Sequence, residues 1–485
     1  MQILLIFAIF WPALAGVGLW FLPSARADRH LRGQLYLLAL GLELLAALLL
    51  AFGQGTELTL LTMAPNLALY FKVDAVGALF AILQILMWLA SCAYALEYLA
   101  GDPHEASYQA LFAAVLSALV GQCFAGSMVT LYVFYELMTL LSVPMVVHER
   151  TPQAVAAGIK YLVYSIFGAT IGLLGIFIFQ RAFGTVDFVP GGHAQTLSAG
   201  LQVMTFLVIL GFGTKAGLFP MHGWLPTAHP VAPACASAVL SGVITKAGVL
   251  AILRLLYFLV GPAALAGTWV QQAFAILTLI TILMGSMLAY REPLLKRRLA
   301  YSTVSQVSYV LFGLALFTPD ALSGGLLHVV AHSVIKDALF LCAGAFIHQT
   351  GKTRVSELRG VGKSMPITLW CWTIAALGLI GIPPTAGFVS KWLLAEGALS
   401  SPMTGVALAG PIVLILSALL TAAYLLQVTI RGFFPGKGEA CVEGAGDPGW
   451  EMLVPQIGLA ALVLLAGVLA SFILGTFGAG LAAIL

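Results

Sequence analysis

The chain has 485 residues, of which 61% are hydrophobic and only 8% carry a formal charge. A soluble domain carries roughly 25% charged residues, so this composition excludes an ordinary soluble fold and indicates a polytopic membrane protein. The formal net charge is +3 and no long Lys/Arg-rich tract is present, which argues against a nucleic-acid partner. The six cysteines are scattered without a C-x-x-C spacing. We interpret them as small core residues and not as a disulfide framework or a metal site.

A membrane span needs ~20 mainly apolar residues. By this criterion residues 1–485 form a single transmembrane domain, with short connections and a longest polar break at 431–451. The first span lacks the basic flank of a cleaved signal, so we expect it to be retained. The fourteen predicted spans have the approximate limits 2–22, 33–53, 74–97, 108–126, 128–147, 160–181, 201–219, 233–260, 266–290, 299–317, 321–349, 366–397, 404–431 and 452–477.

Lysine and arginine are distributed unevenly between the two sets of loops. Loops after odd-numbered spans hold fifteen of the 22, from Arg26 to Lys437, whereas the opposite loops hold only Lys72 and Arg181. Because positive loops stay on the cytoplasmic side, we expect a multi-pass protein of the cell (inner) membrane with both termini on the outer side.

Two predicted spans contain proline breaks. Span 7 is followed by Pro220 and Pro226, and span 12 is interrupted at Pro383 and Pro384. Proline removes a backbone donor and clashes with the preceding turn, so we expect both helices to open there. The breaks are five spans apart, an odd number, which is typical of an inverted-repeat transporter core. Two unrelated proline kinks are the alternative.

Several ionisable residues lie inside the apolar spans. A charge near the bilayer centre costs at least ~2.5 to 3.5 kcal/mol, so such residues usually face protein or water and mark an ion pathway. They are Glu136, Lys215, Lys246, Arg254, Lys336 and Lys391.

Glu136 lies midway along span 5, and Lys215 comes just before the break of span 7. An isolated carboxyl in apolar surroundings takes up a proton, whereas an opposing cation stabilises its charged form. We expect the two to form an ion pair whose opening and closing switches the proton affinity of the lysine. A fixed ion pair that joins spans 5 and 7 is the alternative.

Lys246 has no carboxylate nearby in the sequence, which suits a proton carrier. Arg254 is too basic to release its proton, so we expect it to anchor or to set the local field.

Span 11 contains His328, His332 and Lys336, each four residues after the last. Side chains at this spacing share one helix face, and histidine can change charge near neutral pH. We therefore predict a stripe of titratable groups. Alternatives are a histidine bound to a carbonyl, above all for His328, and zinc ligation, for which no third ligand is evident. Asp337 is expected to pair locally with Lys336.

Lys391 follows the break of span 12 and is expected at the far end of the same line of charges, with snorkelling to the interface as the alternative. His222 and His229 flank the other break and are candidate gate residues. The hydroxyls of residues 301–309 in span 10 suit either a file of water or hydrogen bonds between helices.

Three regions of the chain resemble one known family, the proton-translocating antiporter-like subunits of Mrp-type Na+/H+ antiporters, respiratory complex I and membrane-bound hydrogenases. The likeness covers roughly residues 70–430. The matching segments are residues 215–233 (KAGLFPMHGWLPTAHPVAP) with 237–248 (SAVLSGVITKAG), 295–307 (LKRRLAYSTVSQV) and 381–391 (GIPPTAGFVSK).

The resemblance implies an all-α bundle of about fourteen transmembrane helices, with broken helices 7 and 12 and a lateral chain of charges at mid-membrane. It implies two inverted five-helix repeats at about 108–260 and 266–431, flanked by helices in 1–97 and 452–485. By matching position, Glu136 and Lys215 are the family's ion pair and Lys246 is the central lysine. The helix 11 relay is then His332 with Lys336, and the terminal residue is Lys391.

The combination of Lys391 with Trp392 looks more like the D-type subunit of Mrp antiporters than the M-type subunit of complex I, which often has glutamate at this position. One departure is Ala234-Cys235 after Pro233, where relatives often have threonine, and it could alter the packing of helix 8.

These features predict a cation/proton-translocating subunit of a multisubunit membrane complex, most similar to the D-type subunit of Mrp antiporters. A proton-pumping subunit of complex I or of a membrane-bound hydrogenase is the alternative within the family. Expected partners are other subunits, the lipid bilayer and protons, with sodium left open. No redox motif or cofactor ligand set appears, so we expect no cofactor and no chemistry from this chain alone. The predicted path comprises Glu136, Lys215, Lys246, His328, His332, Lys336 and Lys391.

Three other classes remain open from the sequence. They are a carrier of an organic solute, a redox subunit with an internal quinone pocket, and a non-conducting scaffold.

Overall fold

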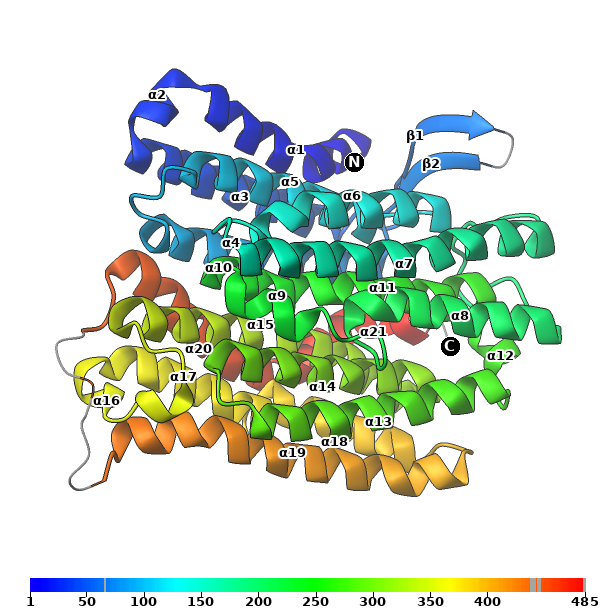
Figure 1. The fold of residues 1–485 in the computed structure, drawn as a ribbon. Coiled ribbons are helices and arrows are strands. Elements are labelled where there is room, and N and C mark those ends of the chain that lie inside the picture. Colours follow the sequence, from blue (N-terminus) through cyan, green and yellow to red (C-terminus); the bar gives the residue numbers. More distant parts are fainter. Residues whose placement is uncertain (65–66, 437–441, 443–445, 483–485) are drawn as a thin grey trace.

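The structure, a computed structural model, describes residues 1–64, 67–436, 442 and 446–482. Figure 1 shows rows of helices lying side by side, from α1 (Gln2–Phe21) at one edge to α19 (Thr404–Phe433) at the other. Helices satisfy backbone N–H and C=O groups within one segment, which an apolar chain needs in lipid. Lys437 and Cys441 lie outside the described residues.

Within the described residues, thirteen helices are long and apolar enough to cross a membrane. Besides α1 and α19 they are α3 (Arg29–Leu50), α4 (Ala75–Tyr98), α5 (Glu105–Cys123), α6 (Met128–Val146), α7 (Pro152–Phe183), α8 (Ala199–Ala216), the composite helix Ala234–Val260, α13 (Trp269–Arg291), α14 (Leu295–Leu316), α15 (Pro319–Thr350) and α20 (Trp450–Val468). The predicted membrane fold is confirmed, while the limits of the two repeats remain predictions.

The shorter elements connect or extend these helices. Most are single turns or pieces of broken spans. They are α2 (Pro23–Ala27), α9 (Leu225–Val231), α12 (Pro262–Leu265), η3 (Val355–Glu357), α16 (Val361–Ser364), α17 (Pro366–Ile380), α18 (Ala386–Leu399) and α21 (Ala470–Ala482).

Both predicted breaks are present. After α8, Gly217 adopts a left-handed conformation with φ of +76°, and the chain then forms the separate short helix α9. The second break separates α17 from α18 at Gly381, where φ is +94°. Glycine adopts such angles at no steric cost. The indole N–H of Trp224 donates to the carbonyl of Thr214 at 2.7 Å, so protein contacts satisfy part of the opened backbone.

The eighth span is irregular over its whole length. It consists of α10 (Ala234–Val239), the π-helical turn η1 (Leu240–Ile244), α11 (Thr245–Arg254) and a second π-helical segment, η2 (Leu255–Val260). Its hydrophobic residues are fully or almost fully buried. Single π-helical turns occur frequently at functional sites, and Lys246 lies two residues after the end of the first one.

A two-stranded antiparallel hairpin, β1 (Glu57–Ala64) and β2 (Leu67–Lys72), extends from one end of the bundle (Figure 1). Lys72 forms an ion pair with Glu57 at 2.9 Å, and its backbone N–H donates to the carbonyl of Phe124. The span pattern of the sequence does not indicate this hairpin, because it treats residues between the second and third spans only as a connection.

Candidate functional site

Lys215 is fully buried at the C-terminal end of α8, inside a cage of aromatic rings. Its ammonium donates to the hydroxyl of Tyr161 at 2.6 Å and lies 4.0 Å from the centroid of the same ring. The rings of Trp224 and Tyr135 lie 5.8 and 6.0 Å away. Aromatic faces attract a desolvated cation, so the cage stabilises the charged form of this lysine without a carboxylate.

The predicted contact between Glu136 and Lys215 is not formed in this structure. Tyr161 of α7 is the hydrogen-bond partner of Lys215, and within the described residues no ion pair joins Lys215 to Glu136. Oε1 of Glu136 is buried and accepts no hydrogen bond from any described residue. The two charges still interact electrostatically. They are therefore neighbours held apart, which argues against a fixed ion pair between the two helices.

Lys246 of α11 contacts His332 of α15. Its Nζ lies 2.5 Å from Nδ1 of His332 and 2.8 Å from the carbonyl oxygen of Ser241, to which it donates. Both side chains are at most 1% exposed. A hydrogen bond between two nitrogens requires one proton between them, so this pair can pass a proton without water.

The stripe on α15 continues from His332 to the second break. The rings of His332 and His328 lie 6.1 Å apart, and Nδ1 of His328 lies 2.9 Å from the hydroxyl of Ser390 on α18. The ring of Tyr309 stacks on His328 and lies 5.2 Å from the ammonium of Lys391. His332, His328 and Lys391 thus follow one another from α15 to α18, with the ring of Tyr309 beside the last two. The alternative of a carbonyl partner for His328 is wrong at Nδ1, which bonds a hydroxyl.

Lys391 closes the open end of the broken helix α17. Its ammonium donates to the carbonyls of Leu379 at 2.6 Å and Ile380 at 3.0 Å. Cations at the C-terminal end of a helix satisfy its last carbonyls and interact well with its dipole. This contact ties the ammonium to the break itself and not to a headgroup region, which disfavours the snorkelling alternative.

Lys336 points to a different neighbour from the histidines. It donates to the carbonyl of Leu299 at 3.0 Å and to the hydroxyl of Ser302 at 2.7 Å, both on α14. Ser302 also accepts a hydrogen bond from Tyr424 of α19. Of the span 10 hydroxyls, Ser302 therefore contacts one of the buried ionisable residues, Lys336.

Other hydroxyls of this span join helices. Ser305 bonds Ser286 of α13 at 2.8 Å, and Ser286 in turn bonds Ser417 of α19 at 2.6 Å.

The expected pairing of Asp337 with Lys336 is wrong. Asp337 accepts a hydrogen bond from Ser91 of α4 at 3.4 Å, and its other oxygen lies against Gly242 of η1. Adjacent residues of a helix do not face each other, so the two charges leave α15 in different directions.

Arg254 anchors the C-terminal end of α11, as expected. Its guanidinium donates two hydrogen bonds to Asp74, at 2.5 and 2.9 Å, and a third to the carbonyl of Cys123. Paired bonds of this kind are among the strongest in proteins. The carboxylate of Asp74 also caps α4 through the N–H of Gly77. Sequence reasoning did not single out Asp74, because it lies 180 positions away from its partner.

The two candidate gate histidines differ in their surroundings. His222 is half-buried and stacks on Phe219, with ring centroids 5.9 Å apart. His229 is fully buried and stacks on Phe340 at 4.7 Å, and neither of its ring nitrogens has a hydrogen-bond partner among the described residues. It also interacts electrostatically with Lys296 and, less strongly, with Lys336. Of the two histidines, His229 is therefore the one that interacts electrostatically with a predicted pathway residue.

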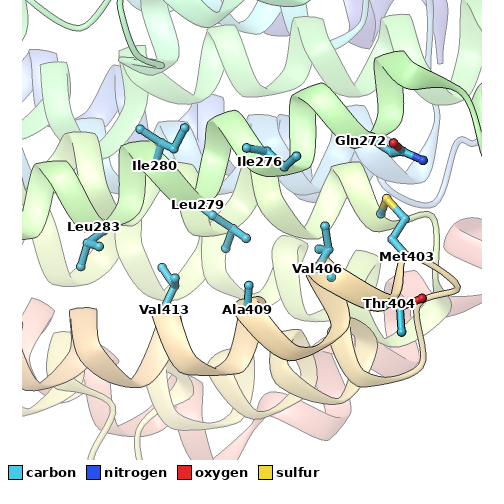
Figure 2. Close-up of a pocket in the computed structure, with 11 residues that line it drawn as sticks. Gln272, Ile276, Leu279, Ile280, Leu283, Met403, Thr404, Val406, Ala409 and Val413 are labelled. Atoms are coloured by element: carbon cyan, nitrogen blue, oxygen red, sulfur yellow. The ribbon is translucent and has the colours of Figure 1, made fainter.

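A large cavity of the bundle lies away from these groups. Figure 2 shows residues of α13 and α19 that line this cavity. Its volume is about 520 Å³. None of the predicted pathway residues line it, and its walls are mainly aliphatic. Its lining includes Ile276, Leu279, Ile280, Leu283, Val406 and Val413.

Residues 125–419 match a family described as "NADH:quinone oxidoreductase/Mrp antiporter, TM". The chain belongs to this family. The match includes both breaks and every predicted pathway residue from Glu136 to Lys391, so the resemblance expected from the sequence is confirmed.

Relatives in the family cover most of the chain. This chain is 35% identical over 377 residues to the N-type subunit of the NADH-quinone oxidoreductase of Desulforudis audaxviator. The matched region covers 77% of this chain and 74% of that protein. It is 28% identical over 404 residues to the D-type subunit of the Na(+)/H(+) antiporter of Alkalihalophilus pseudofirmus, covering 81% and 79%. One protein of the Mrp complex from Dietzia sp. DQ12-45-1b superimposes with a TM-score of 0.85 at 25% identity, covering 100% of this chain and 98% of that one.

Proposed function

We propose that this chain is a proton-translocating subunit of a multisubunit membrane complex. Protons pass sideways through the bundle along a series of buried basic groups, in the order Lys215, Lys246, His332, His328 and Lys391. The observation that carries the proposal is the 2.5 Å contact between Nζ of Lys246 and Nδ1 of His332. Two buried bases in direct contact, on helices from different parts of the chain, serve no packing purpose that apolar residues would not serve better.

The pathway is controlled, in this proposal, by the choice of partner at Lys215. Its ammonium is held by Tyr161, while the nearby Glu136 has an unused carboxylate oxygen. Movement of the ammonium from the hydroxyl to the carboxylate would raise its proton affinity. A change in the relative positions of Glu136 on α6 and Tyr161 on α7 would thereby control proton release from Lys215 toward Lys246.

The relatives support membership of a larger assembly. One is named as a subunit of an Na(+)/H(+) antiporter, one as a subunit of NADH-quinone oxidoreductase, and the structural neighbour is part of an Mrp complex. We favour a role like that of the D-type subunit of Mrp antiporters, with sodium moved by the assembled complex. The 35% identity to the oxidoreductase protein favours a redox-driven complex as the second candidate.

We also propose that both termini face the outer side of the inner membrane. The support is the loop charge, since fifteen of the 22 Lys and Arg residues fall in the loops after odd-numbered spans.

The test uses the assembled complex in sealed vesicles with a pH-sensitive dye. Lys246→Met removes the amine but keeps a similar apolar volume, and we expect it to abolish proton movement while the complex assembles. Lys363→Met is the matched control, because Lys363 is exposed on α16. A Lys246→Met complex that moves protons at the wild-type rate would contradict the proposal. Driving the wild type with a sodium gradient, and separately with an electron donor, distinguishes the two candidate complexes.

A further inference from the structure

The proposed relay leaves one buried acid without a role. Asp337 on α15 has no exposed surface, and its Oδ1 has no hydrogen-bond partner among the described residues. Its Oδ2 accepts only a long hydrogen bond, 3.4 Å, from Ser91 of α4. A buried carboxylate without a cation or a proton is strongly unfavourable. The position therefore calls for a proton on the carboxyl group or for a cation beside it, and a cation is required whenever the group is ionised.

The Oδ1 atom of Asp337 lies against the span that carries Lys246. A Cβ atom placed on Gly242 would lie 1.8 Å from Oδ1 of Asp337. Only glycine lets the carboxylate approach η1 this closely. Gly242 lies about one helical turn before Lys246 in the same span.

The side chain of Lys246 extends back to this same turn. Its ammonium donates to the carbonyl of Ser241, the residue directly before Gly242. Side chains in a helix tilt toward its N-terminus, so the lysine runs alongside the glycine that the carboxylate contacts. Lys246 and Asp337 also interact electrostatically.

The other charged groups around Asp337 have other partners. Lys336, its neighbour in the sequence, bonds Leu299 and Ser302 of α14. His332 lies one turn away on α15 and bonds Lys246 itself. From α4, the contact is the uncharged hydroxyl of Ser91. Lys246 is therefore the cation placed to neutralise Asp337.

We propose that Asp337 is the counter-ion of Lys246, and that it holds the ammonium form of this lysine whenever His332 does not accept its proton. This inference rests on the proposed function, in which Lys246 carries protons. The transfer breaks one N–H bond on Nζ of Lys246 and forms one on Nδ1 of His332, so one positive charge passes from α11 to α15. Asp337 stabilises the positive charge on Lys246 more than the same charge on His332, so it favours the state before the transfer. Asp337 thereby controls how long Lys246 keeps its proton before the transfer to His332.

A double-mutant cycle tests the pair independently of transport. The variants are Asp337→Asn, Lys246→Met and both together, and the readout is the thermal midpoint of the assembled complex in detergent. We expect the double variant to lose at least about 2 °C less than the sum of the two single losses, because each single variant leaves a buried partner uncompensated. Additive losses would overturn the proposal. If Asp337→Asn does not assemble, assembly of the double variant supports the pair, and failure of both overturns it.

Transport provides the second readout. Asp337→Asn should slow proton movement about tenfold or more, and Asp337→Glu, which restores a carboxylate, should recover part of the rate. Gly242→Ala removes no polar group but occupies the place of Oδ1, so it should reproduce the loss. An Asp337→Asn complex with the wild-type rate would overturn the inference. Absence of proton movement in the wild type would instead contradict the proposed function. The result of the double-mutant cycle would still show whether Asp337 and Lys246 interact.

Discussion

Lys215 bonds Tyr161 and not Glu136, with 2.6 Å between its ammonium and the phenol oxygen. Tyr161 in turn bonds Ser142 of α6, at 2.7 Å. The hydroxyl therefore links α6, α7 and α8 next to the first break, at the C-terminal end of α8. A neutral partner holds the lysine more weakly than a carboxylate would, so this arrangement leaves the ammonium free to change partner.

Removal of the phenol hydroxyl should shift this balance. In Tyr161→Phe the ammonium of Lys215 loses the hydrogen bond that it donates to the phenol oxygen. A hydrogen bond that involves a charged group is worth about 1.5 to 3 kcal/mol, so we expect the ammonium to stay with Glu136. Proton movement in vesicles should fall about tenfold. The exposed Tyr290 provides the control, and Tyr290→Phe should transport normally. Unchanged proton transport in Tyr161→Phe would show that the phenol hydroxyl does not control the choice of partner of Lys215.

Loss of the Glu136 carboxylate should also prevent the exchange of partners at Lys215. We expect Glu136→Gln and Glu136→Ala to abolish proton-linked transport, because no acid then competes with Tyr161 for Lys215. Co-purification of the partner subunits checks that the complex still assembles. Normal transport by both variants would count against the ion pair.

Lys391 combines a relay position with a structural contact, so its variants should separate the two. Lys391→Met leaves the carbonyls of Leu379 and Ile380 without their donor, and we expect a loss of stability of about 1 to 3 kcal/mol together with loss of transport. Lys391→Arg should keep the carbonyl bonds and the stability but not the transport, because arginine does not release its proton. Transport by Lys391→Arg at the wild-type rate would remove Lys391 from the relay. Lys352→Met, at an exposed site, is the control.

Arg254 should matter for stability and not for proton transfer. Arg254→Met leaves Asp74 without its two hydrogen bonds, and breaking a buried pair from one side costs about 3 to 5 kcal/mol, with a smaller loss here because Asp74 is partly exposed. We expect a lower thermal midpoint, measured by light scattering or intrinsic fluorescence. Arg181→Met changes an exposed arginine and should leave the midpoint unchanged. Equal midpoints for Arg254→Met and the wild type would refute the anchor.

A pH effect is expected outside the membrane spans, at Asp102 between α4 and α5. Partial burial tends to raise its pKa, but hydrogen bonds from the N–H of His104 and from His148 outweigh this, so the pKa lies below its ordinary value of 3.8. A depressed carboxyl pKa stabilises the fold above the ordinary value, and this stabilisation is lost as the pH falls through the lowered pKa. The thermal midpoint of Asp102→Asn should therefore lie below that of the wild type at neutral pH, with the difference vanishing at acidic pH below the ordinary value. A difference that persists unchanged into strong acid would refute this linkage, and Glu451→Gln, at an exposed site, is the control.

The features that the sequence alone predicts correctly are those that depend on residues close along the chain. Spans follow from the local density of apolar side chains, and both breaks follow from prolines beside glycines. The stripe of His328, His332 and Lys336 follows from helical periodicity. Its order along α15 was therefore predictable, but the direction in which Lys336 leaves the stripe was not.

The partners of the buried charges were decided only by the tertiary structure. His332 lies 86 positions from Lys246, Tyr161 lies 54 from Lys215, and Ser91 lies 246 from Asp337. Apolar helices can pack in many rotations with similar burial, so the amino-acid pattern of one helix does not say which side chain of another it meets. The amino-acid sequence by itself predicted that several ionisable residues would lie inside apolar helices. Packing determined which of them touch, because hydrogen bonds between helices depend on positions to within a few tenths of an ångström.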